Sequence, residues 1–149
     1  MADSGLTDLD KKWFDFTSAY VTKLNQSGGH DWDSLSEEEQ ELAALWKLEM
    51  DMYNGGFIQF FCNWGYDCYT HAVRCLTKLQ ANECLDIITQ QYSIIERLGD
   101  DERLTALWDI PKYLTEEEAK ALDELDHRYW DNTDTIQEKT FQVYSHLQP

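Results

Sequence analysis

The residues best suited to metal-assisted acid–base chemistry form one short stretch. Glu124, Asp126 and His127 lie in an E-x-x-H sequence, the unit that helix bundles contribute to di-iron and di-manganese sites. Such a site needs a second E-x-x-H and two further Glu, and no second E-x-x-H occurs in the sequence. We therefore interpret His127 as a surface histidine on an acidic helix.

A second candidate is a thiol and imidazole cluster. Cys68, His71 and Cys75 are spaced i, i+3 and i+7, so they could share one face of a helix. Zinc would require a fourth ligand, and the spacing is not that of a zinc finger. Nucleophile-elbow, P-loop and dinucleotide-binding signatures are absent. We expect buried, reduced thiols, no metal, no cofactor and no enzymatic activity, with a metal-dependent enzyme as the less favoured rival.

Net charge is the most unusual property of the sequence. The 149 residues include 29 Asp and Glu against 12 Lys and Arg, a formal net charge of −17. A field of this sign repels nucleic acids and anionic membranes and attracts basic surfaces. The N-terminus is polar, and no apolar run approaches the ~20 residues of a membrane span. These features predict a cytoplasmic protein that binds neither nucleic acid nor membrane directly.

The negative charge is concentrated at the two ends of the sequence. Residues 1–51 and 100–149 each carry a net charge of −8, whereas residues 52–99 carry −1. Carboxylates one turn apart on a helix lie roughly 6 Å apart along its axis, and each DNA strand carries one charge per ~3.4 Å. Neighbouring acidic helices could approach that density. The candidate partner-binding carboxylates are Asp31, Asp33, Glu37, Glu38, Glu41, Glu116, Glu117, Asp123, Glu124, Asp126, Asp131 and Asp134.

Helices are the elements that must position these carboxylates. Apolar residues recur at helical spacing throughout, and S/T-x-x-D/E capping boxes begin at Thr7, Ser36 and Thr115. We predict an all-α single domain over residues 1–149, with six or seven helices. It comprises acidic helices in 1–51, a near-neutral core in 52–99 and acidic helices in 100–149. The expected helices cover 7–26, 36–54, 57–64, 69–79, 82–98, 115–130 and 134–147.

One motif lies in the near-neutral middle of the sequence. Its residues are Asn54, Gly55, Gly56, Phe57, Gln59, Phe60, Phe61 and Asn63. This N-G-G-F-x-Q-F-F-x-N pattern, together with the stretch at 122–130, resembles a bacterial family of acidic all-α DNA-mimic proteins over roughly residues 37–147. We expect the three Phe residues in the core, and Gln59 and Asn63 to hold the glycine turn by hydrogen bonds.

The resemblance implies a partner and a mode of action. The best-known member of that family is a homodimer that occupies the DNA-binding face of a helix-turn-helix transcription factor. The implied function is inhibition of operator binding, and thereby control of gene expression, by carboxylates that replace phosphates. The alternative is a generic acidic or immunity-type protein that binds another basic protein.

Overall fold

The structure is a computed structural model that describes residues 7–147. Six α-helices and four short 3-10 helices make up most of this range. The α-helices are α1 (Asp8–Gln26), α2 (Glu37–Met52), α3 (Phe57–Leu79), α4 (Asn82–Ile95), α5 (Glu116–Trp130) and α6 (Ile136–Val143). The 3-10 helices are η1 (Trp32–Ser34), η2 (Glu96–Leu98), η3 (Leu107–Tyr113) and η4 (Ser145–Leu147). No strand occurs between residues 7 and 147, so the prediction of an all-α fold is confirmed.

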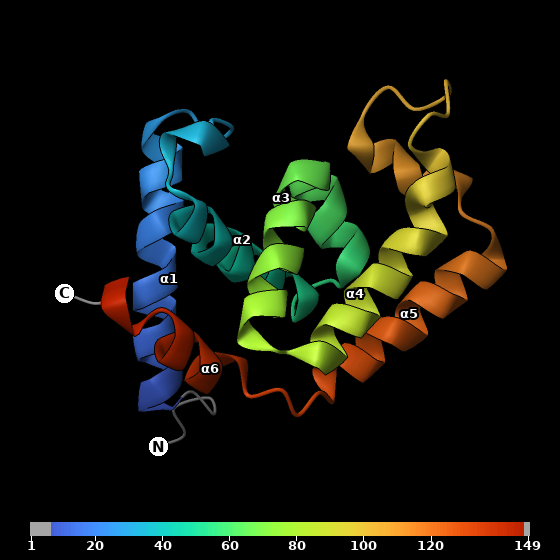
Figure 1. Cartoon of the computed structure of the whole chain (residues 1–149). Coiled ribbons are helices and arrows are strands. Elements are labelled where there is room, and N and C mark those ends of the chain that lie inside the picture. The colour runs from blue at the N-terminus through green and yellow to red at the C-terminus, as the bar shows by residue number, and fades with distance from the viewer. Residues whose placement is uncertain (1–6, 148–149) are drawn as a thin grey trace, which may run out of the picture.

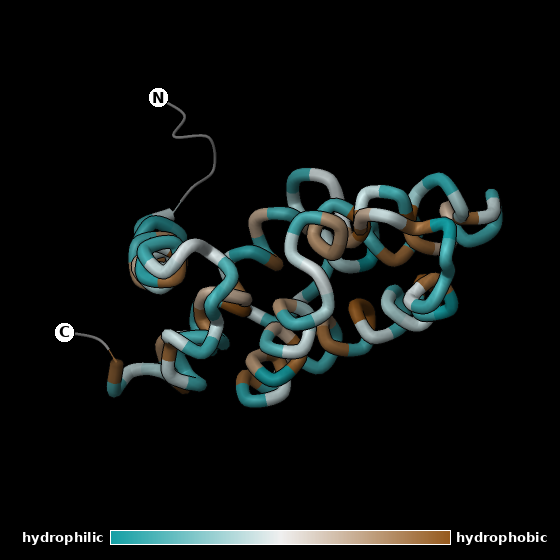
Figure 2. Tube along the Cα trace, turned by 90° about the horizontal axis from the view of Figure 1, so that it is seen from above, coloured by the Kyte–Doolittle hydropathy of each residue, from teal (hydrophilic) through white to brown (hydrophobic). Residues whose placement is uncertain are grey.

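The helices are arranged around α3, as Figure 1 shows. Helix α2 packs against both α1 and α3, while α6 packs against α1. Helices α4 and α5 lie side by side on the opposite side of α3 (Figure 1). Figure 2 shows hydrophilic and hydrophobic segments alternating along the helices, as expected when each helix buries one side.

Local capping sets the start of three helices. Thr7, Ser36 and Thr115 each accept a hydrogen bond from the backbone N–H three residues later, at 3.0–3.2 Å. In each case the acidic side chain at that later position accepts a bond back from the backbone N–H of the capping residue. The three predicted capping boxes are therefore confirmed.

The most apolar segment forms the centre of the core. Phe57 and Phe60 are fully buried, and Phe61 is nearly so. The sequence predicted two helices over 57–64 and 69–79, and α3 consists of two helical parts that meet at a kink at Gly65. Gly65 has φ of 84° and ψ of −171°, a non-helical conformation that glycine adopts readily, so the chain leaves the helical conformation at this residue and changes direction.

Several predicted helix boundaries differ from the structure: α2 ends at Met52 and not near residue 54, and the last α-helix ends at Val143 and is followed by η4. The predicted helix 82–98 is an α-helix only as far as Ile95 and ends in the 3-10 helix η2, and Gly99 after it is right-handed, with φ of −58°. The last α-helix begins at Ile136, two residues later than predicted. Thr135 before it is left-handed, with φ of 50°, and Asp134 is used elsewhere as a helix cap.

Candidate functional site

Helix α5 presents its carboxylates on the side that faces away from the core. Its buried side consists of Leu122, Leu125, Asp126 and Tyr129, which pack toward the rest of the molecule. The exposed acidic residues on the other side, which we call the α5 acidic face, are Glu116, Glu117, Asp123, Glu124 and, just past the helix end, Asp131. The spacing of the buried residues therefore determines which carboxylates face solvent.

Most of the α5 acidic face is free of basic partners. Among residues 7–147, no Lys or Arg lies within 4.0 Å of the carboxylates of this face. Asp123 is 3.6 Å from His127, and both side chains are well exposed. Backbone and charge interactions with Asp123 raise the pKa of His127. The face therefore keeps a net negative charge that is available to a partner.

The carboxylates of the α5 acidic face are spaced almost as densely along the helix as the phosphates of one DNA strand. Glu116 and Asp131 are separated by about 22 Å of helix at 1.5 Å per residue. Five carboxylates lie within that length, where one strand of duplex DNA would place about six phosphates. Lys120 and Arg128 are also exposed on α5 and lower the net charge of this region.

The acidic residues that open α2 are largely engaged within the protein. Glu39 caps Ser36 and forms a salt bridge with Lys23 at 2.8 Å. Glu38 contacts His146 at 2.6 Å. Glu37 is exposed but lies 3.6–3.7 Å from two basic groups on α3. Helix α2 is therefore a weaker candidate for a partner surface than α5.

Glu41 must be removed from the predicted partner-binding set. Its side chain is fully buried because this side of α2 packs against α3. It accepts hydrogen bonds from Arg74, Lys78 and Tyr144 at 2.5–2.9 Å. Burial raises the pKa of Glu41, but these hydrogen bonds outweigh burial and hold the pKa below its ordinary value. Glu41 is a structural ion, not a surface charge.

Asp126 and Asp134 are also misassigned by the sequence prediction, since each is only 9 % exposed. Asp126 accepts the backbone N–H of Phe57 at 3.0 Å and the side-chain amide of Gln91 at 2.7 Å. Asp134 accepts the backbone N–H of Cys84 at 2.7 Å. The first turns of α3 and α4 present unpaired N–H groups, and these carboxylates satisfy them.

Asp31 and Asp33 lie on the surface, away from the α5 acidic face. Both are exposed and have no salt bridge within residues 7–147. They belong to the connection between α1 and α2, which Figure 1 places at the opposite end of the molecule from α5. One rigid partner of ordinary size is therefore not expected to contact both this loop and the α5 acidic face of the same molecule.

Asp51 is a key residue that the sequence prediction missed. Its backbone carbonyl accepts the N–H groups of Gly55 and Gly56 at 2.8 and 2.9 Å. Its carboxylate accepts hydrogen bonds from the side chains of Gln59, Asn63 and Trp64 at 2.7–3.3 Å. Gln59 and Asn63 therefore bond the side chain of Asp51, and it is the backbone carbonyl of Asp51 that bonds the glycine turn. The sequence feature that could have identified Asp51 is its position one helical turn before the two glycines.

The thiols and the imidazole do not form a ligand set. All four Cys are buried and free, and burial raises the pKa of Cys62 to about 11 and of Cys75 to about 12. His71 packs against Trp32 and contacts Arg74 at 3.1 Å. Within residues 7–147, no group of three His, Cys, Asp or Glu residues is placed to hold a metal ion.

The fold and this surface define a class of acidic, all-helical proteins that present carboxylates on a rigid frame. The family model described as DMP19-like protein matches residues 33–146, and the chain therefore belongs to that family. DMP19 is a DNA-mimic family and is not a known enzyme family. No curated protein matches this sequence, and no solved structure matches it. Within the described residues, no helix is long and apolar enough to cross a membrane.

Proposed function

We propose that this protein is a DNA mimic that uses the α5 acidic face to occupy the DNA-binding surface of a helix-turn-helix transcription regulator. The carboxylates would take the positions of phosphates and pair with Lys and Arg of the regulator. Operator DNA and the mimic would then compete for one surface. Gene expression would respond because less regulator remains on its operator.

One observation carries the proposal. Within residues 7–147, Lys and Arg pair with carboxylates such as Glu39, Glu41 and Glu118, whereas none lies within 4.0 Å of a carboxylate of the α5 acidic face. Solubility alone would not require a row of unpaired carboxylates on one helix face. A fixed row of this density is what a phosphate-binding surface recognises.

A homodimer would extend this surface. The dimer is an expectation from the family resemblance. A regulator with two-fold symmetry reads half-sites about 34–36 Å apart, which is longer than the roughly 22 Å of one α5 acidic face. Two copies related by a two-fold axis could match both half-sites. Light scattering of the purified protein tests the dimer separately from the mimicry.

The decisive experiment is competition between this protein and operator DNA for a purified helix-turn-helix regulator. In the α5 variant, Asp123→Asn, Glu124→Gln and Asp131→Asn remove three charges from the face. The matched control, Asp31→Asn with Asp33→Asn and Glu138→Gln, removes three exposed charges elsewhere. We expect the α5 variant to lose roughly five-fold to a hundred-fold in affinity, at a few tenths to 1 kcal/mol for each of three exposed pairs, and the control to lose much less.

A reciprocal variant tests the same face by a gain of affinity. Lys120 is exposed on α5 and has no salt bridge within residues 7–147. Lys120→Glu should tighten regulator binding by a few-fold and leave helical content unchanged. Equal binding by the wild type and all three variants would contradict the assignment of the face. Recovery of a basic toxin or enzyme as the partner from lysate would instead favour an immunity-type function.

A further inference from the structure

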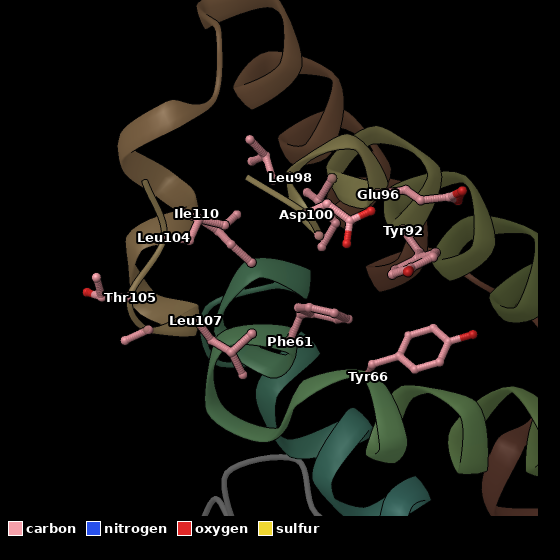
Figure 3. A pocket seen from close by; sticks show the side chains of 13 residues that line it. Phe61, Tyr66, Tyr92, Glu96, Leu98, Asp100, Leu104, Thr105, Leu107 and Ile110 are labelled. Carbon is pink, nitrogen blue, oxygen red and sulfur yellow. The ribbon is translucent and has the colours of Figure 1, made fainter. Parts of the chain in front are cut away.

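A cavity separate from the α5 acidic face lies between α3, the end of α4 and the segment that follows it. Its volume is about 590 Å³, within the range of small-molecule sites. Figure 3 shows its side chains in place. Leu98, Leu104 and Ile110 supply aliphatic surface on one side, and the lining includes no Lys, Arg or His.

Aromatic rings form the other side of this cavity. The ring centroids of Tyr66 and Tyr92 are 5.5 Å apart, and those of Phe61 and Tyr92 are 5.6 Å apart. Tyr66 is 53 % exposed, so part of its ring is open to solvent and to a ligand. The faces of such rings carry partial negative charge and attract cations.

Two carboxylates complete the lining. Glu96 and Asp100 are exposed, and neither has a salt bridge within residues 7–147. The basic residues nearby are used elsewhere: Arg97 pairs with Glu118, and Arg103 pairs with Asp101 and stacks on Tyr113. In Figure 3 the carboxylate of Asp100 points into the space above Phe61, whereas Glu96 extends along the rim.

We propose that this cavity binds a small organic cation with an apolar body, such as a quaternary ammonium compound. The apolar part would fill the space between the aromatic and aliphatic walls. The charged part would lie against the Tyr rings and near Asp100. An anion would be repelled by both carboxylates, and a hydrated metal ion would leave the apolar walls uncovered. The inference does not depend on the DNA-mimic proposal.

The test is an NMR titration of the ¹⁵N-labelled protein with three ligands that share a phenyl ring. Benzyltrimethylammonium is the cation, benzyl alcohol the neutral ligand and benzenesulfonate the anion. We expect the cation to shift the amides of the segment from Gly99 to Leu107 and to bind on the order of tenfold more tightly than the alcohol. The anion should cause no shifts in this segment.

Matched variants separate this site from general attraction to an acidic protein. Asp100→Asn should weaken cation binding several-fold and leave the alcohol unaffected. Glu102→Gln, an exposed residue of the same segment outside the lining, removes the same charge and should change nothing. Tyr66→Leu should also weaken the cation, and the spectrum of each variant reports its fold.

Two results would overturn the inference. One is equal affinity for the cation and the alcohol in the wild type. The other is equal loss of cation binding in Asp100→Asn and Glu102→Gln, which would indicate non-specific attraction. The α5 variants described above should retain cation binding, so the two proposals can fail independently.

Discussion

Glu49 is a buried acid that forms no salt bridge with any Lys, Arg or His of residues 7–147. It is 4 % exposed and accepts a hydrogen bond from the hydroxyl of Tyr129. Burial raises the pKa of Glu49 from 4.5 to about 7, and the bond from Tyr129 offsets part of that shift. The folded state therefore binds this proton more tightly than the unfolded state, so the group favours folding when protonated.

The sign of the resulting pH dependence follows from these two pKa values. Between pH 4.5 and about pH 7, the unfolded chain has lost the proton and the folded protein keeps it. Stability contributed by Glu49 is present below this window and falls by roughly 3 kcal/mol as pH rises through it. Glu49→Gln should therefore stabilise the protein relative to wild type above about pH 7. Urea unfolding near pH 5.5 and near pH 8 measures this, and a pH-independent difference would contradict it.

Position 56 requires glycine, both because of its backbone conformation and because Asp126 lies close to it. Its φ is +94°, and a Cβ built there would lie 2.1 Å from the carboxylate of Asp126. Gly56→Ala should therefore displace Asp126 from the start of α3 and cost about 3 kcal/mol or more in unfolding free energy. Gly28 has a similar φ of +96° but open space around it. Gly28→Ala is the control and should cost only about 1 kcal/mol.

The helices themselves were largely predictable because their signals are local. Thr7, Ser36 and Thr115 each begin a helix through a contact with a residue three positions later. The caps from Asp126 and Asp134 were not predictable, since they join residues 69 and 50 positions apart. For the same reason the sequence could nominate acidic rows but could not separate buried carboxylates from exposed ones. Only packing distinguishes them.

A comparison within α5 tests the capping role at the scale of the element. Asp126→Ala would leave the backbone N–H of Phe57 and the amide of Gln91 without their acceptor in the interior. We expect a loss of about 2–3 kcal/mol in unfolding free energy. Asp123→Ala, three residues earlier and exposed, should change stability by less than about 0.5 kcal/mol. Thermal melts of the two variants measure the contrast, and equal melting temperatures would contradict the cap.

Across the whole molecule, the negative charge is unevenly placed and incompletely neutralised. The net charge of −17 comes almost entirely from the two terminal thirds. Like charges at this density oppose compaction, and the near-neutral middle supplies the helix at the centre of the core. The arrangement keeps self-repulsion at the periphery, where water and salt screen it, and leaves the same charges exposed to a basic partner.

Added salt should therefore act on folding and on partner binding in opposite directions. Screening weakens the repulsion among surface carboxylates, so the free protein should gain about 1 kcal/mol between low and physiological ionic strength, or about 3 °C in Tm. The same screening should weaken the complex with a helix-turn-helix regulator over that range. The α5 charge-neutral variant should show a smaller salt response in both measurements, because it lacks three of the charges. Complex formation that is insensitive to salt while the fold is stabilised would place the contact on an apolar surface and remove the basis for mimicry.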